Sequence, residues 1–237
     1  MDVQELEQII RRREGTMSNA FPALMRKVYV WMTLALVITG ICAYGVATSP
    51  ALLQLIYSNR AALWVLLIAE IGLVFYTSAR INSLSLTTAT TLFAIYSALN
   101  GVTLSAIFLA FTLSSIASVF FITAGTFAAT ALYGYTTKRD LSKIGSILFM
   151  GLIGLILATV VNMFLHNGIL NLILSYVGVV IFVGLTAWDS QKIRQMLAMQ
   201  GDTGETAQKV ALMGALTLYL DFINLFLYLL RIFGKER

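Results

Sequence analysis

The sequence predicts an α-helical integral membrane protein with about seven membrane-spanning helices. Of its 237 residues, 59% are hydrophobic and only 11% are charged, whereas a soluble domain usually carries about 25% charged residues. The apolar residues form long continuous runs. These runs indicate helices, because the strands of a membrane barrel would give short alternating segments.

Seven runs approach or exceed the length of about 20 apolar residues that a helix needs to cross a hydrocarbon core about 30 Å thick. Pro22 and Pro50 are the two prolines of the chain and fall outside these runs, so no span is expected to carry a proline kink. The runs are about Val28–Thr48, Ala61–Ala79, Leu86–Ala110, Ile116–Tyr135, Ile144–Leu165, Ile169–Trp188 and Val210–Leu230.

The runs predict a single membrane domain with a tail at each end. The N-terminal tail could form an interfacial helix with Val3, Leu6 and Ile10 on one face, or stay partly ordered. The expected parts are a cytoplasmic tail over residues 1–27, a seven-span domain over 28–231 and a C-terminal tail over 232–237.

The basic residues predict a cytoplasmic N-terminus, because lysine and arginine are enriched in the cytoplasmic loops of membrane proteins. The outer side would receive Arg60 and the tail residues Arg231, Lys235 and Arg237. If the last segment re-enters instead of crossing, those tail residues would join the inner side, so its path is open. The twelve inner residues are Arg11, Arg12, Arg13, Arg26, Lys27, Arg80, Lys138, Arg139, Lys143, Lys192, Arg194 and Lys209.

Several functional classes are not expected from this composition. The basic residues lie between apolar runs, which favours contact with anionic lipid over binding of nucleic acid. Cys42 is the single cysteine, so an intrachain disulfide or a cysteine metal cluster cannot form. We find no phosphate-binding loop, nucleophile elbow or zinc motif, so neither an enzyme nor a bound cofactor is expected.

Charged residues within spans are the strongest functional candidates, because a charge in the hydrocarbon core is costly. Three acids qualify: Glu70 in the second run, Asp189 at the end of the sixth and Asp221 within the seventh. Arg80, ten residues after Glu70, could be a snorkelling anchor or could pair with one of the acids. Asn224 lies on the same helical face as Asp221 and could donate a hydrogen bond to it.

The two late aspartates could meet, depending on the length of the sixth helix. If Lys192 and Lys209 mark the membrane surface, Asp221 lies about 18 Å deep and Asp189 only about 4.5 Å deep. If the helix continues through Met196–Met199, Asp189 lies about 15 Å deep and the two can touch. Two adjacent carboxyl groups would share a proton and titrate as one unit, forming a proton-sensitive latch or a Ca²⁺ site.

Four segments carry a resemblance to the bacterial branch of the transmembrane Bax inhibitor motif family. The likeness covers nearly the whole chain from about residue 20. The segments are Asn100–Ser105 (NGVTLS), Leu132–Leu141 (LYGYTTKRDL), Trp188–Ile193 (WDSQKI) and Leu218–Phe226 (LYLDFINLF), of which the last is the most specific.

The resemblance implies two three-helix layers around a central C-terminal helix. It also implies a pH-sensitive passive leak of Ca²⁺ through the inner membrane, governed by an aspartate pair that matches Asp189 and Asp221. Glu70 and Arg80 would correspond to the acid and base of the second span, with the base latching the closed state. Their spacing differs from the family pattern by about a residue, and the loop between the aspartates is longer.

Two alternative functions share features with this sequence. Some bacterial relatives are thought to modulate a membrane-bound protease system, so the chain could instead regulate a protein partner without transport. Intramembrane aspartyl proteases also place aspartates on two late spans, but they carry Gly-x-Gly-Asp where this chain has Leu218-Tyr219-Leu220-Asp221. They also need a later Pro-Ala-Leu motif, and no proline follows Pro50.

Overall fold

The computed structural model describes the backbone of residues 3–58 and 60–237, and the side chains of residues 20–58 and 61–237. Within this part of the chain, seven helical segments are long and apolar enough to cross a membrane, as predicted. The helices are α1 (Val3–Ala47), α2 (Pro50–Tyr57), α3 (Arg60–Arg80), α4 (Leu86–Leu104), α5 (Ala106–Ala110), α6 (Leu113–Thr136), α7 (Ser142–Leu165), α8 (Gly168–Ala198) and α9 (Glu205–Phe233).

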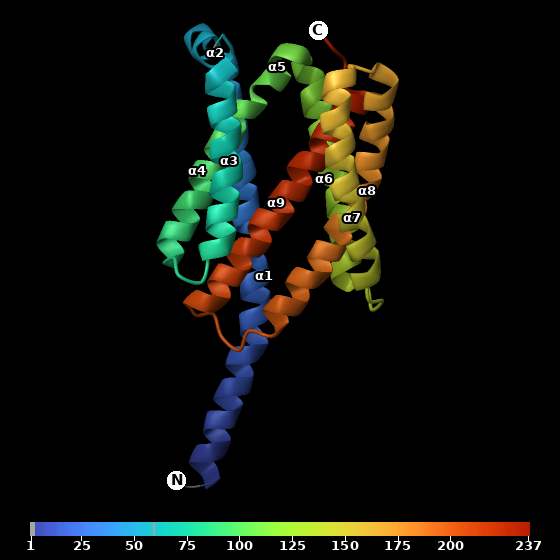
Figure 1. Ribbon diagram of the computed structural model, residues 1–237. Coiled ribbons are helices and arrows are strands. Elements are labelled where there is room, and N and C mark those ends of the chain that lie inside the picture. Colours follow the sequence, from blue (N-terminus) through green and yellow to red (C-terminus); the bar gives the residue numbers. More distant parts are fainter. Residues whose placement is uncertain (1–2, 59) are drawn as a thin grey trace.

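Helix α9 lies at the centre and runs diagonally between two groups of helices (Figure 1). Helices α1, α3 and α4 form one group and α6, α7 and α8 the other, while α9 packs against members of both. In the apolar stretch of α9, 67% of the residues are buried, against 11% in α3 and α7. This is the layered arrangement that the family resemblance implied.

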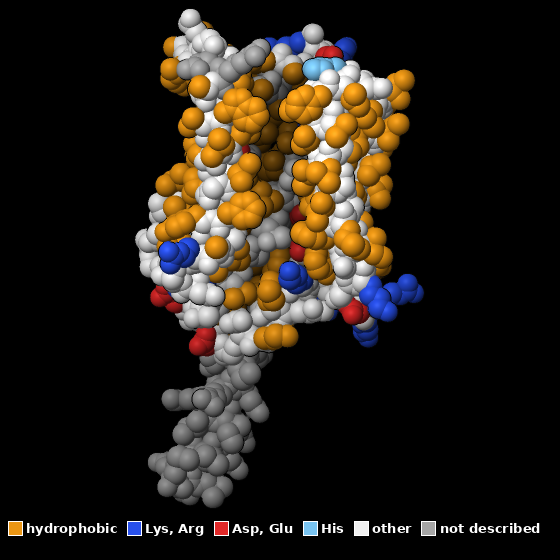
Figure 2. All heavy atoms as spheres, in the orientation of Figure 1, with side chains coloured by type: hydrophobic (Ala, Val, Ile, Leu, Met, Phe, Trp, Pro, Cys, Tyr) orange, Lys and Arg blue, Asp and Glu red, His pale blue; other side chains and the backbone are white. Residues whose placement is uncertain are grey.

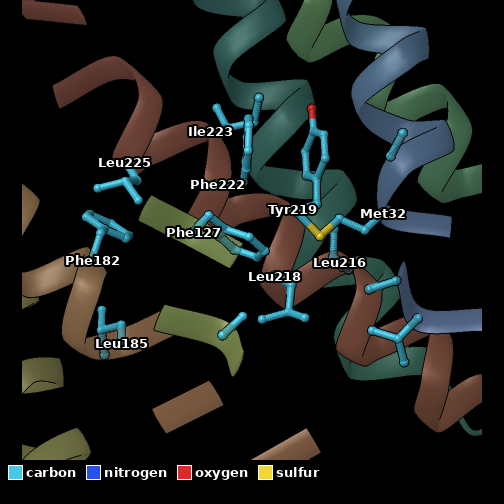
Figure 3. Packing of buried hydrophobic residues seen from close by; sticks show 14 of the residues in the cluster. Met32, Phe127, Phe182, Leu185, Leu216, Leu218, Tyr219, Phe222, Ile223 and Leu225 are labelled. Atoms are coloured by element: carbon cyan, nitrogen blue, oxygen red, sulfur yellow. The ribbon is translucent and has the colours of Figure 1, made fainter. Parts of the chain in front are cut away.

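Aromatic and aliphatic side chains of α9 form the core. Figure 3 shows Phe222 beside Phe127 of α6, and their ring centroids are 5.5 Å apart. Nearby on α9, the ring of Tyr219 meets Phe93 of α4 at 5.7 Å. Lipid is as apolar as these side chains, so close packing and hydrogen bonds, rather than exclusion of water, hold the helices together.

The outer surface is also apolar, as contact with lipid requires (Figure 2). Phe75 of α3, Phe121 of α6 and Ile169 of α8 are more than 70% exposed, at 72%, 73% and 75%. Contiguous exposed apolar surface of this kind is not tolerated by a soluble monomer. The chain is therefore an integral membrane protein.

The first span begins earlier than predicted. Helix α1 runs without interruption from Val3, and its apolar segment starts at Ala20. Pro22 therefore lies inside a span, contrary to the prediction. The boundary was placed after Lys27, but basic side chains can extend from a helix end to the membrane surface, so they do not end the helix. The predicted face of Val3, Leu6 and Ile10 lies outside the described side chains.

The sixth span is longer than its apolar run. Helix α8 continues ten residues beyond Trp188, to Ala198, so the loop before α9 covers only residues 199–204. The extension consists mainly of good helix formers, and its Ile193 and Leu197 are buried in the core. This is the extended sixth helix on which contact between the two aspartates depended.

The last helix runs the full length of the bundle, and the C-terminus lies at the end opposite the N-terminus (Figure 1). The tail after α9 pairs with the loop between α5 and α6: the Thr112 N–H donates to Lys235 O (3.1 Å) and the Arg237 N–H to Ala110 O (3.0 Å). The third predicted run is split at Ser105 into α4 and α5.

Candidate functional site

The site is built around a carboxyl group in the centre of the bundle. Asp221 lies in the middle of α9 and is 5% exposed. Its Oδ2 atom is buried and has no N–H or O–H partner among the described residues. An isolated buried carboxylate is strongly unfavourable, so a proton, a cation or another carboxyl group must satisfy it.

The second carboxyl group comes from α8. The side chains of Asp189 and Asp221 lie within hydrogen-bonding reach of each other. A hydrogen bond between two carboxyl groups requires at least one proton, so it cannot form when both groups are ionised. The structure thus brings together the two aspartates that the sequence singled out.

A cavity of about 440 Å³ lies between α7, α8 and α9 beside the pair. Most of its wall is aliphatic or aromatic, and its polar groups are few. Figure 2 shows acidic side chains inside a hollow of the face in view. Besides Asp189 and Asp221, the polar lining consists of Lys192, Thr217, Asn224 and the ring of Tyr228.

Lys192 supplies the positive charge nearest to the pair. It follows Asp189 by one helical turn, and its charge acts on the Asp189 carboxyl group. Its Nζ lies 5.1 Å from the centre of the Trp188 ring, within the range of a cation–π interaction. Lys192 therefore adds a positive charge to the cavity that the two aspartates line.

Asn224 does not make the predicted hydrogen bond to Asp221. Its Nδ2 donates to the Leu220 carbonyl oxygen one turn earlier in the same helix, at 2.8 Å. In a helix, a short polar side chain can reach the backbone carbonyl oxygen four residues earlier, and Asn224 uses this acceptor instead of the Asp221 carboxyl group. Asn224 still lines the cavity, next to the pair.

Glu70 and Arg80 lie elsewhere. Glu70 is buried on α3 and accepts a hydrogen bond from the Thr103 hydroxyl of α4. Arg80 is exposed at the end of α3, and neither residue lines the cavity beside the aspartates. Since α3 packs mainly on α4 and α2, Arg80 is held away from α8 and α9. Its role as a latch stays a prediction.

Sequence reasoning missed Gln191, which positions the end of the site. Its Nε2 donates to the Arg139 carbonyl oxygen (2.7 Å), and its Oε1 accepts from the Leu141 N–H (2.9 Å). This side chain therefore ties the α6–α7 loop to α8, two residues from Asp189. The available signal was a glutamine two residues after the aspartate in the WDSQKI segment.

The same loop carries an acid with a simpler environment. Asp140 is fully exposed, and its Oδ1 accepts a hydrogen bond from the Ser142 N–H at 2.9 Å. Hydrogen bonds from Ser142 hold the pKa of Asp140 below its usual range, with a smaller contribution from Lys143. Asp140 thus stays ionised at neutral and mildly acidic pH.

Known proteins resemble this chain over almost all of its length. The sequence profile of a family described as "Inhibitor of apoptosis-promoting Bax1" matches residues 22–237. The inner membrane protein YbhL of Escherichia coli is 50% identical over 233 residues, covering 98% of this chain and 97% of its own. Uncharacterized proteins of Borreliella burgdorferi and Rickettsia prowazekii are 46% and 42% identical, covering 95% of this chain and 96% and 94% of their own.

Proposed function

Because the chain belongs to the Bax inhibitor family, we propose that it is a passive Ca²⁺ leak gated by protonation of Asp189 and Asp221. The observation that carries the proposal is the contact between these two carboxyl groups at the wall of the cavity between α7, α8 and α9. Paired intramembrane acids usually mark an ion or proton path. The named E. coli relative supports a bacterial inner membrane as the location.

The chemistry of the cavity favours passage of a cation over its storage. Ca²⁺ takes six to eight oxygen ligands in a tight site. Among the described side chains, no group of three or more His, Cys, Asp and Glu residues could hold a metal ion. The oxygen atoms of the aspartate pair, with those of Thr217 and Asn224 and with water, would bind Ca²⁺ weakly. Conduction requires an ion to leave as readily as it enters.

Protonation would change the charge of the pair and so act as the gate. With one proton, the pair holds α8 to α9 and keeps a negative charge that attracts Lys192 at the mouth of the cavity. A second proton removes this charge and breaks the attraction, which frees the Lys192 side chain. The leak should therefore rise as the pH falls.

The test uses purified protein in liposomes loaded with a Ca²⁺-sensitive dye. The wild-type leak should increase as the pH is lowered from about 8 to about 6, a range that buried carboxyl groups reach. Asp189→Asn and Asp221→Asn should remove this dependence, because asparagine has nearly the same shape but cannot exchange the proton. Each variant is compared with wild type at each pH.

Asp140→Asn is the matched control. Asp140 stays ionised over this range, so its replacement should leave both the leak and its pH dependence unchanged. If the two buried variants behave as wild type at every pH, the gating mechanism is wrong. If folded wild-type protein passes no Ca²⁺ at any pH, the transport function itself is wrong. A regulator of a protein partner would give that result.

The proposal assigns the pair no hydrolytic role. An intramembrane protease would cleave a reporter helix in the same liposomes, and Asp221→Asn would abolish the cleavage. We expect no cleavage by the wild-type protein or by the Asp221→Asn variant.

A further inference from the structure

A second, larger cavity lies on the surface of the bundle, and neither Asp189 nor Asp221 lines it. It measures about 690 Å³ and forms a groove between α1 and α6. Met32 and Leu36 of α1 line one wall, Ala124 and Ala128 of α6 the other, and Phe222 of α9 contributes to the floor. Because α1 and α6 belong to different helix groups and both pack on α9, α9 separates them and leaves this groove open to the membrane.

The residues of the wall explain why the groove is deep and apolar. The small side chains Ala124 and Ala128 leave room on the α6 side, while Phe120 and Phe127 pack on Phe222 with ring centroids 5.4 and 5.5 Å away. The floor is thus a cluster of packed aromatic rings. At membrane depth, the apolar walls of such a groove can pack against a hydrocarbon chain.

The groove is at least as long as one leaflet is thick. On α1 it extends from Met25 to Leu36, about 16 Å at about 1.5 Å per residue. On α6 it extends from Phe120 to Tyr135, about 22 Å. One leaflet supplies half of a hydrocarbon core about 30 Å thick, so an acyl chain entering at the Arg26 end would reach the mid-plane near Leu36.

The basic and phenolic side chains of the groove gather at one end. That end is lined by Arg26, Tyr29 and Tyr135. The side chain of Arg26 is exposed and is the basic group among the lining residues. The Arg194 guanidinium lies 6.0 Å from the centre of the Tyr135 ring. Phe21 stacks on the same tyrosine at 6.3 Å and joins α1 to α6 there. Arginine with tyrosine is the combination found where side chains meet lipid headgroups.

We propose that this groove binds one anionic phospholipid, with an acyl chain between α1 and α6 and the headgroup phosphate at Arg26. The positive charge complements the phosphate, and the tyrosine hydroxyl groups can donate to its oxygens. Free phosphate would leave the apolar groove unfilled, so the ligand is a lipid of the adjoining leaflet. This site is independent of the proposed Ca²⁺ leak.

Native mass spectrometry of purified protein tests the proposal. Delipidated protein is mixed with equal amounts of phosphatidylglycerol and phosphatidylcholine that have the same acyl chains. We expect one phosphatidylglycerol to be retained in preference to phosphatidylcholine. Arg26→Gln should lower that preference by about fivefold, the effect of one basic residue near an anionic headgroup. Ala128→Phe should fill the groove and abolish retention of either lipid.

Two controls separate the site from general lipid contact. Ala129→Phe adds the same ring one residue away, on a position of α6 that is exposed but does not line the groove. Lys143→Gln removes an exposed basic residue at the start of α7, outside the groove. Both should retain lipid as wild type does. Equal retention of the two lipids by wild type, or no effect of Ala128→Phe in a folded protein, would overturn the proposal.

Discussion

At the scale of single residues, a buried polar contact joins three helices in the core of the bundle. The Thr39 hydroxyl of α1 faces two carbonyl oxygens, those of Ala35 and Ser97, each 2.9 Å away. Its single proton is used there, so it accepts from the Tyr219 hydroxyl of α9 at 2.7 Å. Tyr219 precedes Asp221 by two residues, so this contact orients α9 near the site.

Replacing Thr39 by valine should destabilise the protein. The change keeps the shape of the side chain but leaves the buried Tyr219 hydroxyl without this acceptor. We expect a loss of about 1 kcal/mol, the usual scale for hydrogen bonds between membrane helices. The measurement is the midpoint of thermal unfolding in detergent, followed by size-exclusion chromatography of the heated samples.

Thr33→Val provides the comparison. Thr33 is an exposed threonine of the same helix that donates to the Tyr29 carbonyl oxygen at 2.8 Å. Its replacement should leave the unfolding midpoint almost unchanged. Equal midpoints for the Thr39 and Thr33 variants would show that the contact with Tyr219 contributes nothing.

At the scale of helices, the position of α8 depends on one close approach to α6. A side chain placed on Gly134 of α6 would overlap the backbone carbonyl group of Ala187 in α8. Ala187 lies two residues before Asp189, so this contact sets the depth and distance of the Asp189 backbone. Backbone atoms cannot move aside as the end of a side chain can, and small residues permit such approaches in membranes.

Gly134→Ala should therefore lower stability by about 1–3 kcal/mol, the cost of overpacking. Gly125→Ala on the same helix has open space around the new methyl group, and alanine is the better helix former. We expect it to leave the protein unchanged or slightly more stable. Thermal unfolding of both variants decides the matter: a Gly134 variant as stable as the Gly125 variant would contradict tight α6–α8 packing.

At the scale of the whole molecule, seven crossings place the chain ends on opposite sides of the membrane. The basic residues further predict that the N-terminus and the α6–α7 loop are cytoplasmic. Lys138 lies in that loop and Lys235 in the C-terminal tail, and both are exposed. The orientation sets which compartment contributes ions and protons to each end of the proposed path.

Cysteine labelling tests the orientation, because Cys42 is the single native cysteine. In a Cys42→Ala background, Lys235→Cys should react with a membrane-impermeant maleimide added to cells whose outer membrane is permeabilised. Lys138→Cys should react only after the inner membrane is opened as well. The reverse pattern would invert the topology. Protection of both would place both chain segments in the cytoplasm and argue against seven crossings.

Much of the fold and of the site could be predicted from the sequence. Long apolar runs predicted the spans, because a segment that crosses the hydrocarbon core must be apolar and must satisfy its backbone as a helix. Asp189 and Asp221 were recognisable because charges at membrane depth are costly. The predicted boundaries at Val28 and Trp188 were wrong, since hydropathy marks where the chain is apolar and not where a helix begins or ends.

The apolar runs and the two aspartates within them were therefore enough to predict a seven-span membrane protein with two exceptional residues. The contact between the two carboxyl groups could be seen only in the folded chain, where α8 extends to Ala198. The folded chain also places Lys192, rather than Arg80, beside them. The cost of burying a charge depends on the residue and its apolar neighbours in the sequence, so it can be predicted from a short segment. Which charges lie side by side depends on how helices that are distant in the sequence pack together.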